Sequence, residues 1–441
     1  MRSISVIRRD PLAFLNRMYV DYGDVVQFPI PDPPTYLISN PMAARHVLVS
    51  NARSYGKKTI QYTTLSLVTG ERLLTADTDV WRAQRRRLQP AFHHSTLELI
   101  AEHVRASTEK MLSTWSQESS TVIDMDAAMM HLALDVVGKS LFGSDLSADA
   151  DRLARATIEA LDIVVKKAQS PLSPPLRIPT PTNLSLRRAI ANLDDAVDRM
   201  LAERRARPLS AGDPPRDMLD LLLAEDEQGQ TMSAQEIRSQ IITFIVAGHE
   251  TVASALTWAW QLLSTHPEVF ERVRAESAAV VASGGPYFTD LDRCRVTAAV
   301  VDEVLRLYPP AWLITRRSLE ADEVGGVEIP SGALMIVSPW LVHRHPSLWD
   351  RPHQFIPDRF LDESGQRRRE VINGPGYIPF GAGPRLCIGR DMALVEAVLV
   401  LAAMASRIDI VPVGPSPRAM PLVTIRPEGG LPMRVTVKPQ P

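Results

Sequence analysis

The fold of this chain is decided by the stretch Phe380-Gly381-Ala382-Gly383-Pro384-Arg385-Leu386-Cys387-Ile388-Gly389-Arg390. Glycine and proline interrupt regular structure here, whereas residues 391–400 form an apolar run of good helix formers without a breaker. We therefore expect Cys387 to lie at or just before a helix N-terminus. The helix dipole and free backbone N–H groups there favour negative charge and would lower the pKa of the thiol. A thiolate in that place is a soft ligand suited to the axial position of haem iron.

Two other interpretations of the stretch fail on spacing. Gly381 and Gly383 begin like a dinucleotide-binding fingerprint, but Leu386 stands where the third glycine is needed. A phosphate-binding Walker loop needs Gly-Lys-Ser/Thr, which is absent. For a lone cysteine in an arbitrary loop, a buried structural residue is the alternative.

The spacing Phe-x-x-Gly-x-x-x-Cys-x-Gly, made by Phe380, Gly383, Cys387 and Gly389, resembles the haem-binding signature of the cytochrome P-450 family. The resemblance implies that Cys387 holds the iron of haem b (iron protoporphyrin IX) and that Arg385 binds a propionate. It also implies a mostly α-helical fold with a smaller β-rich region, and a haem buried between a long central helix and the cysteine-loop helix. We expect glycine in the loop because backbone passes close to the flat macrocycle, where a Cβ would collide.

Composition limits the class of protein. The 441 residues carry a formal net charge of −2, which gives no case for nucleic acid or an anionic membrane as partner. Only two cysteines occur, Cys294 and Cys387, so we expect no disulfide framework and a reducing cytoplasm. Residues 1–22 are interrupted by charges and contain no apolar core long enough for a signal peptide or membrane anchor. We expect a cytoplasmic monomer.

We expect a single domain, 1–441, with β-rich portions at about 23–40 and 311–340 and a helical core at about 80–308. The Asp10-Pro11 pair should open a helix ending near Gly23, and Asn40-Pro41 should cap a short one. Strands are expected at Val25–Phe28, 36–38, Val327–Ile329 and Leu334–Val337, and loops at 54–79, 170–183 and 208–215. The first two loops are expected over a pocket, the second as a proline-rich mobile lid.

A long helix is predicted from about Ser233 to Thr265, opened by a capping box with Glu236. It contains Ala247-Gly248-His249-Glu250-Thr251, and a glycine in mid-helix costs about 1 kcal/mol relative to alanine. This segment resembles the family's oxygen-binding segment. The resemblance implies that Ala247 and Gly248 leave room for dioxygen, that Thr251 orients iron-bound oxygen, and that Glu250 serves the proton route. The alternative is a threonine that bonds back to a carbonyl and a glutamate that faces solvent.

Two further groups of residues follow from the resemblance. Glu303 and Arg306 lie three apart, an ordinary helical ion pair by itself, but with Arg359 they match the family's buried network beneath the haem loop. The residues matching propionate contacts are Trp81, Arg85 and Arg316. Neighbouring arginines form either a solvated helix surface or a patch for an acidic electron donor, namely Arg82, Arg86 and Arg87.

The resemblance implies a haem-thiolate monooxygenase, which inserts one oxygen atom of O2 into a C–H or C=C bond. The matching pocket positions are mostly apolar and predict a hydrophobic substrate, a terpenoid or fatty-acid-like natural-product intermediate; they are Phe244, Ala247, Ala311, Trp312, Leu313, Ile314 and Leu422. No flavin or iron–sulfur segment is recognisable, so electrons from NAD(P)H should arrive through a ferredoxin and a ferredoxin reductase. A peroxide-driven peroxygenase and a non-catalytic haem sensor remain alternatives.

Overall fold

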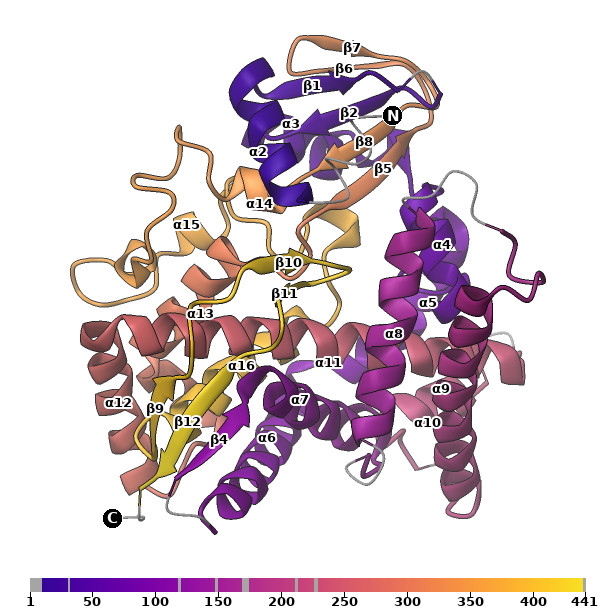
Figure 1. The fold of residues 1–441 in the computed structure, drawn as a ribbon. Coiled ribbons are helices and arrows are strands. Elements are labelled where there is room, and N and C mark those ends of the chain that lie inside the picture. The colour runs from indigo at the N-terminus through magenta and orange to yellow at the C-terminus, as the bar shows by residue number, and fades with distance from the viewer. Residues whose placement is uncertain are drawn as a thin grey trace.

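A computed structural model describes residues 10–30, 32–117, 120–146, 150–168, 174–210, 213–225 and 229–438. Most of them form a helical body, and a smaller sheet-rich region covers one end of it (Figure 1). The longer helices are α2 (Pro11–Tyr22), α4 (Ile60–Thr69), α5 (Thr78–Leu88), α6 (His94–Trp115), α7 (Met125–Phe142), α8 (Ala150–Ala168), α9 (Pro181–Arg205), α11 (Ala234–Thr265), α12 (Pro267–Ala282), α13 (Arg295–Leu307) and α16 (Arg390–Met404). The shorter ones are α3 (Pro41–Arg45), α10 (Met218–Leu223), α14 (Pro339–Val342) and α15 (Arg369–Ile372).

The main sheet joins strands from both ends of the chain. Its order is β1 (Val25–Phe28), β2 (Thr35–Ile38), β8 (Leu334–Val337), β5 (Ile314–Ser318) and β3 (Tyr55–Gly56). The pair β2–β8 is parallel and the other pairs are antiparallel. The two β-rich portions expected far apart in sequence therefore form one structure.

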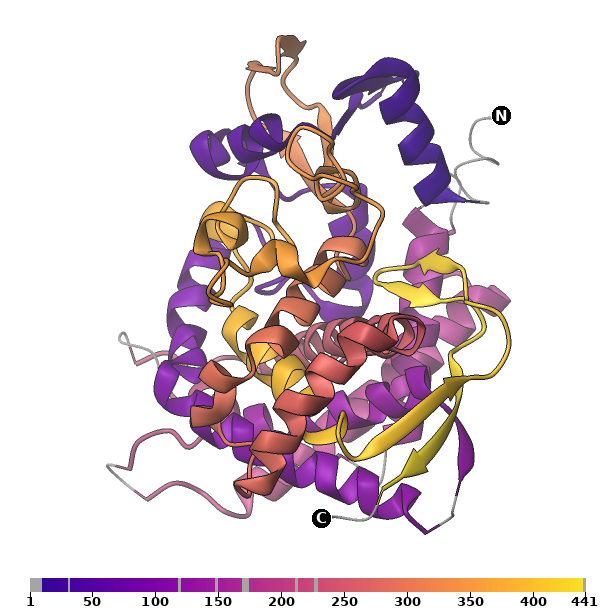
Figure 2. The same ribbon diagram turned by 90° about the vertical axis from the view of Figure 1, so that its left-hand side faces the viewer.

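Three smaller sheets complete the strands. The first is β6 (Asp322–Val324) with β7 (Val327–Ile329), the second β4 (Thr121–Asp124), β12 (Pro432–Val437) and β9 (Ile408–Pro412), and the third the hairpin β10 (Ala419–Pro421) with β11 (Ile425–Pro427). Figure 2 shows the yellow C-terminal strands of the last two sheets on one side of the helical body. Their position places the C-terminal hairpin beside the central helix.

Helix α11 crosses the middle of the helical body and packs against α7, α13 and α16 (Figure 1). Its start is fixed by the predicted capping box, in which Glu236 N–H donates to Ser233 Oγ (3.3 Å) and Ser233 N–H to Glu236 Oε2 (2.9 Å). Among the described helices, α11 alone is long and apolar enough to cross a membrane, but 83% of its most apolar window is buried inside the fold. Burial on most faces explains why it is apolar all round.

The sheet-rich region is tied together at Asp322. Its Oδ2 accepts from Tyr55 Oη (2.5 Å) and Asn51 Nδ2 (3.0 Å) and lies 2.8 Å from His46 Nε2. Despite partial burial, these bonds hold the pKa of Asp322 at about 2. His46 begins the π-helical turn η1 (His46–Ser50), so the carboxylate fixes this turn to strands β3 and β6.

Most expected elements are confirmed, including α2, the β1–β2 pair, α3, β7 and β8. The loop expected over residues 54–79 is wrong, because it contains α4. Thr59 caps this helix and Gly70 ends it, while Leu65 and Val68 face the core. The chain is interrupted between α8 and α9 as expected, but residues 170–173 of the proposed lid and 211–212 of the next loop lie outside the described residues.

Candidate active site

An internal cavity lies between α11 and the loop that precedes α16. Cys387 and Thr251 both line it, from opposite walls. The apolar part of the wall is formed by Leu73, Leu74, Phe92, Leu141, Phe244, Ala247, Val252, Ala255, Val301, Leu305, Pro310, Ala311, Ile314, Phe380, Leu386, Ile388, Met392, Ala393 and Ala397. The cavity is therefore an apolar chamber with a thiol at one wall and a hydroxyl at another.

The cysteine loop is held by its own backbone. Cys387 N–H donates to Phe380 O and Leu386 N–H donates to Gly383 O, both at 3.0 Å. Arg85 Nη1 donates to Leu386 O at 2.5 Å and joins α5 to the loop. Helix α16 begins at Arg390 with Gly389 as N-cap, as predicted. These bonds fix the sulfur-bearing residue so that it lines the cavity.

The prediction of a lowered thiol pKa is wrong for the polypeptide alone. Cys387 is exposed and lines the cavity, but burial of the thiol within the fold raises its pKa. The N–H of Gly389 and the charges of Arg85 and Arg390 act in the opposite direction but do not outweigh burial. A metal cation bound to the sulfur would reverse the balance, because coordination deprotonates a thiol.

The two signature glycines are required for different reasons. Gly383 has φ +68°, and a Cβ there would lie 2.1 Å from Leu48 O in η1. Its glycine is needed for contact with another backbone segment, a reason that the sequence did not reveal. Gly389 lines the cavity, has φ −92°, and its Cβ would meet only Phe92 at 3.5 Å. Within the part of the chain that the structure describes, no atom crowds Gly389.

One end of the cavity is cationic. Arg385 lies with its guanidinium carbon 4.2 Å from the Trp81 ring centre and donates to Ala76 O at 2.8 Å. Burial, with repulsion from Arg316, lowers the pKa of Arg385 to about 10. Lys57 is a buried neighbour whose pKa is lowered well below its usual value by burial and by the same two arginines.

Sequence reasoning missed Lys57, because a lysine after a short strand has no signature that marks it as buried. Of the predicted propionate contacts, Trp81, Arg85, Arg316 and Arg385 all line the cavity. The Arg85 guanidinium, however, bonds to Leu386 O and Gln89 Oε1. An anionic group bound here would relieve the repulsion among Lys57, Arg316 and Arg385.

Thr251 lines the cavity, and its hydroxyl donates to Ala247 O at 2.8 Å. The back-bonded alternative is thus the conformation present. Gly248 also lines the cavity, but a Cβ there would lie 2.9 Å from Val137 Cγ2 of α7. The close approach of α7 is a reason for this glycine that the sequence did not reveal, and it adds to the expected room for dioxygen.

Glu250 does not line the cavity. Its Oε2 accepts from Thr424 Oγ1 (2.9 Å) and its Oε1 from Arg426 Nη1 (3.2 Å), both on the β10–β11 hairpin side. Arg426 also forms an ion pair with Asp126, and burial raises the pKa of both carboxyls. The solvent-facing alternative is wrong as well, since Glu250 is only 3% exposed.

The residues of the predicted network meet beneath the loop. Glu303 accepts from Arg306 Nε (2.6 Å) and Nη2 (2.9 Å), from Arg359 Nε (3.3 Å) and from Ile356 N–H (2.8 Å). Arg306 also donates to three carbonyls, those of His343, Pro352 and Gln354. Glu303 and Arg306 are fully buried and fully hydrogen-bonded, the arrangement in which a buried ion pair is tolerated.

The pocket prediction is half correct. Phe244, Ala247, Ala311 and Ile314 line the cavity. Trp312, Leu313 and Leu422 do not line it. Trp312 is buried elsewhere, with Nε1 donating to Leu422 O at 2.8 Å. This bond ties the indole of Trp312 to the backbone of the hairpin.

Glu396 is a second residue that sequence reasoning missed. It lies on the cavity face of α16 with Met392, Ala393 and Ala397, and it is fully buried. Neither carboxyl oxygen has a hydrogen-bond partner among the described residues, and burial raises the pKa of Glu396 well above its usual value. The available signal was a glutamate with only apolar residues around it in the run 392–400.

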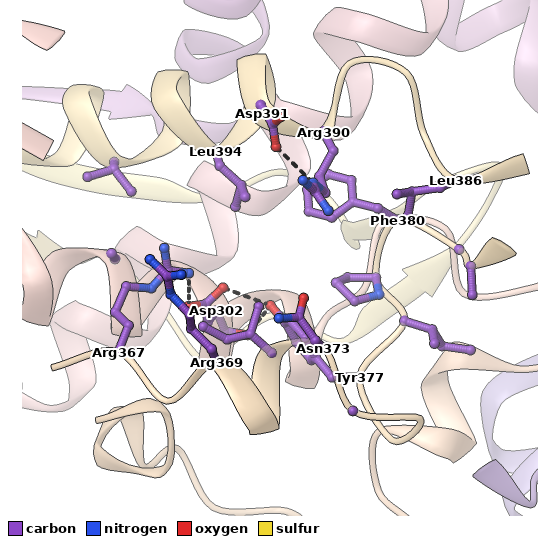
Figure 3. A pocket seen from close by; sticks show the side chains of 18 of the residues that line it. Asp302, Arg367, Arg369, Asn373, Tyr377, Phe380, Leu386, Arg390, Asp391 and Leu394 are labelled. Atoms are coloured by element: carbon purple, nitrogen blue, oxygen red, sulfur yellow. Dashed lines mark hydrogen bonds and ion pairs between the residues drawn. The ribbon is translucent and has the colours of Figure 1, made fainter. Parts of the chain in front are cut away.

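A larger cavity of about 1060 Å³ lies on the other side of the cysteine loop, and Phe380, Gly381 and Leu386 line both cavities. Figure 3 shows its polar wall, where Arg367 pairs with Asp302 and Arg390 Nε lies 2.8 Å from Asp391 Oδ1. Its cations are Arg45, Arg295, Arg367, Arg369 and Arg390, and its acids Asp292, Asp302 and Asp391. The lining of this cavity therefore has more cations than acids.

The residues present fit haem. The cavity offers a thiol ligand, a long apolar wall, an uncrowded Gly389 and a cationic end with Lys57, Arg316 and Arg385 for two propionates. This combination defines a haem-thiolate site.

Comparison with known proteins agrees with that class. The sequence model of the family Cytochrome P450 matches residues 3–429. Cyclooctatin synthase of Streptomyces melanosporofaciens is 37% identical over 91% of this chain and 86% of its own length. Pentalenene oxygenase of Streptomyces avermitilis is 33% identical over 90% of this chain and 86% of its own. The crystal structure of CYP175A1 from Thermus thermophilus superposes with a TM-score of 0.78 at 31% identity, covering 99% of this chain and 97% of the other. The chain belongs to the cytochrome P450 family and is an oxidoreductase of the monooxygenase class.

Proposed function

We propose that this monooxygenase hydroxylates or epoxidises a terpenoid intermediate. The observation that carries the proposal is the separation of charge within the cavity. Its cations gather around Arg316 and Arg385, whereas the wall near Thr251 is formed by Phe244, Ala247 and Ala311. A substrate without charge fits such a wall. The names of Streptomyces relatives point to the same chemistry, among them cyclooctat-9-en-7-ol 5-monooxygenase at 34% identity.

The residues divide the work as follows. Cys387 would bind haem iron as thiolate, and Lys57, Arg316 and Arg385 would bind the propionates. When bound, the haem supplies activation of O2 with two electrons and two protons, so that one oxygen atom enters the substrate and the other leaves as water. The hydroxyl of Thr251 would hold a proton at the wall of the cavity that α11 forms.

Glu250 stays a predicted member of the proton route. Its carboxylate bonds to Thr424 and Arg426, so a role in catalysis requires this pairing to open during turnover. Thr251 already lines the cavity and needs no such rearrangement.

We further propose that an acidic ferredoxin, reduced by NAD(P)H through its reductase, binds over the larger cavity. The cations of this cavity, among them Arg367, Arg369 and Arg390 (Figure 3), lie beside Phe380 and Leu386 of the cysteine loop. Of the arginines predicted from sequence, Arg82 and Arg86 are exposed on α5, but Arg87 donates to the carbonyls of Leu221, Leu222 and Ala224 and is not free for a partner. A monomer in the cytoplasm also remains our proposal.

Spectral titration of the ferric protein tests the substrate class. We expect terpenes to shift the haem from low to high spin at lower concentration than fatty acids or macrolide precursors do. The Cys387→Ala variant should lose both the thiolate-type Soret band of the reduced carbon monoxide complex and oxidation. A spin shift by fatty acids alone would overturn the terpenoid proposal. Product formation with peroxide alone, at the rate given by ferredoxin, would favour a peroxygenase, and normal haem loading without turnover would favour a sensor.

The ferredoxin site is tested by charge removal. Arg369→Gln and Arg390→Gln should each slow electron transfer and weaken its dependence on salt, because steering by charge is screened by ions. Arg434→Gln removes an exposed charge from β12 and should have no effect. Equal rates in all three variants would contradict this site.

A further inference from the structure

A third cavity, of about 600 Å³, opens at the surface where the ends of α11 and α13 meet α14. Its buried floor is formed by Leu262, Leu307, Arg344 and Phe355, and its mouth by the exposed His353 and Gln354. His266, Tyr308 and Trp340 complete the wall. The volume is in the range of small-molecule sites, roughly 300–1,000 Å³. This cavity shares no lining residue with the haem cavity.

Arg344 is the charged group at the floor. It is 9% exposed, and it donates to Trp340 O at 3.1 Å and to Leu307 O. Among the described residues no carboxylate lies within ion-pair distance of it, and the cavity lining contains no Asp or Glu. The charge of Glu303 does act on Arg344, but this carboxylate is already paired with Arg306 and Arg359. A buried guanidinium thus carries a charge that neutral carbonyls only partly compensate.

The surroundings of Arg344 favour one kind of ligand. Its guanidinium carbon lies 3.5 Å from the Trp340 ring centre, and Tyr308 meets Trp340 edge-to-face at 6.4 Å. Arginine has more N–H donors than two carbonyls can accept from, and its planar fork matches a carboxylate. Burial, Arg344 and Arg306 lower the pKa of His353, so its imidazole is neutral at pH 7 and can donate from the mouth. Aromatic walls suit a flat apolar body.

We propose that this cavity binds a small organic carboxylic acid, with its carboxylate on Arg344 and its apolar body between Tyr308, Trp340 and Phe355. The site is coupled to the haem loop, because Arg306 holds the carbonyls of Pro352 and Gln354 on either side of His353. A bound acid therefore stabilises the Glu303–Arg306–Arg359 network and slows haem loss. The proposal does not depend on the substrate of the enzyme.

Calorimetric titration of the haem-loaded enzyme with benzoate, and with benzyl alcohol as its neutral counterpart, tests the proposal. Benzoate should bind one per chain, at least about tenfold more tightly than the alcohol, since a charge-assisted hydrogen bond exceeds a neutral one by that factor or more. The Soret band should stay unchanged, which separates this site from the haem cavity. Benzoate, and not the alcohol, should also slow transfer of haem to apomyoglobin.

Three variants locate the site. Arg344→Gln should abolish the preference for benzoate. His353→Ala should weaken the binding of benzoate roughly threefold. Because His353 lies at the exposed mouth, this variant should fold even if Arg344→Gln does not. Arg434→Gln removes an equal charge far away and should bind benzoate normally. Equal binding of benzoate and benzyl alcohol, a benzoate-induced Soret shift, or unaltered binding by His353→Ala and Arg344→Gln would each overturn the proposal.

Discussion

Two regions of the molecule, one below the cysteine loop on α13 and one above it on α11, each contain a buried glutamate with arginine partners. They differ in the ratio of cations to acids. Below the loop, Glu303 is bonded by Arg306 from its own helix and by Arg359 from a nearby turn. Above it, Glu250 on α11 is bonded by Arg426 from the C-terminal hairpin, which also holds Asp126. In the upper cluster one arginine is paired with two carboxylates, whereas in the lower cluster two arginines are paired with one carboxylate.

The difference predicts different responses to charge removal. Below the loop the excess cations cannot be neutralised by protonation in the physiological range, so the loss of Glu303 leaves charge buried. Above it, carboxyls with raised pKa can take up protons, and the damage depends on pH. The lower cluster is thus a rigid support and the upper one a cluster that can titrate.

The largest effect is expected for Glu303→Gln. It leaves Arg306 and Arg359 buried without a counter-charge, which should cost about 3–5 kcal/mol of unfolding free energy and release haem. Denaturant unfolding of the haem-loaded protein measures this loss. Glu271→Gln is the control, since it removes an exposed acid 3.3 Å from Arg274 and should change stability by less than about 0.5 kcal/mol. Similar costs for both would contradict a supporting role.

Gly383→Ala should be next, at about 2–4 kcal/mol, because alanine is strained at φ +68° and its Cβ meets Leu48 O. Gly389→Ala should cost under about 1 kcal/mol in the haem-free protein, where its φ is ordinary, and should act on haem binding instead. Thermal unfolding without haem, followed by haem titration, separates the two. A reversed order would show that both glycines serve the cofactor.

For Arg426→Met we expect a loss of about 2–3 kcal/mol at pH 8 that shrinks to under about 1 kcal/mol near pH 5. The folded-state pKa values of Asp126 and Glu250 are already raised by burial, and the variant removes the cation that opposes this. The folded state then binds more protons than the unfolded one, so stability falls as pH rises from the ordinary carboxyl pKa through the raised one. Unfolding free energies measured across this range should show that slope, and a flat profile would refute it.

Of the three substitutions at the two glutamates and Arg426, Glu250→Gln should cost the least stability, about 1 kcal/mol, because the amide can still accept from Thr424 and Arg426 keeps Asp126. The effect of Glu250→Gln on turnover can be compared with that of Thr251→Ala. The fraction of NAD(P)H electrons that appears in product should fall far more in Thr251→Ala than in Glu250→Gln. Equal uncoupling would show that the Glu250 carboxylate leaves Arg426 and serves the cavity during catalysis.

Whether a feature could be predicted from the sequence depends on the separation along the chain of the residues that form it. Asp10 capping α2, the Ser233–Glu236 box and the Glu303–Arg306 pair are contacts between residues three apart, and a local pattern predicts them. The cysteine loop was equally legible because its spacing is fixed by one turn of chain.

The missed features depend on partners brought in by tertiary packing. Arg426 meets Glu250 across 176 positions, and Leu48 meets Gly383 from the far end of the chain. Lys57 becomes part of the cavity only through the main sheet. No local pattern encodes such contacts, so the chemistry of the site was predictable whereas the orientation of Glu250 and the role of Gly383 were not.

The contact between Gly383 and η1 connects the N-terminal strands to the loop that carries Cys387, the proposed metal ligand. Because Asp322 anchors His46 and Asn51 at the two ends of η1, its carboxylate acts at a distance as a brace for the sulfur. With a pKa of about 2 it stays ionised at every pH a cell tolerates, so this brace is insensitive to acidity. A neutral residue at 322 should therefore loosen the position of the Cys387 sulfur, although residue 322 does not line the cavity.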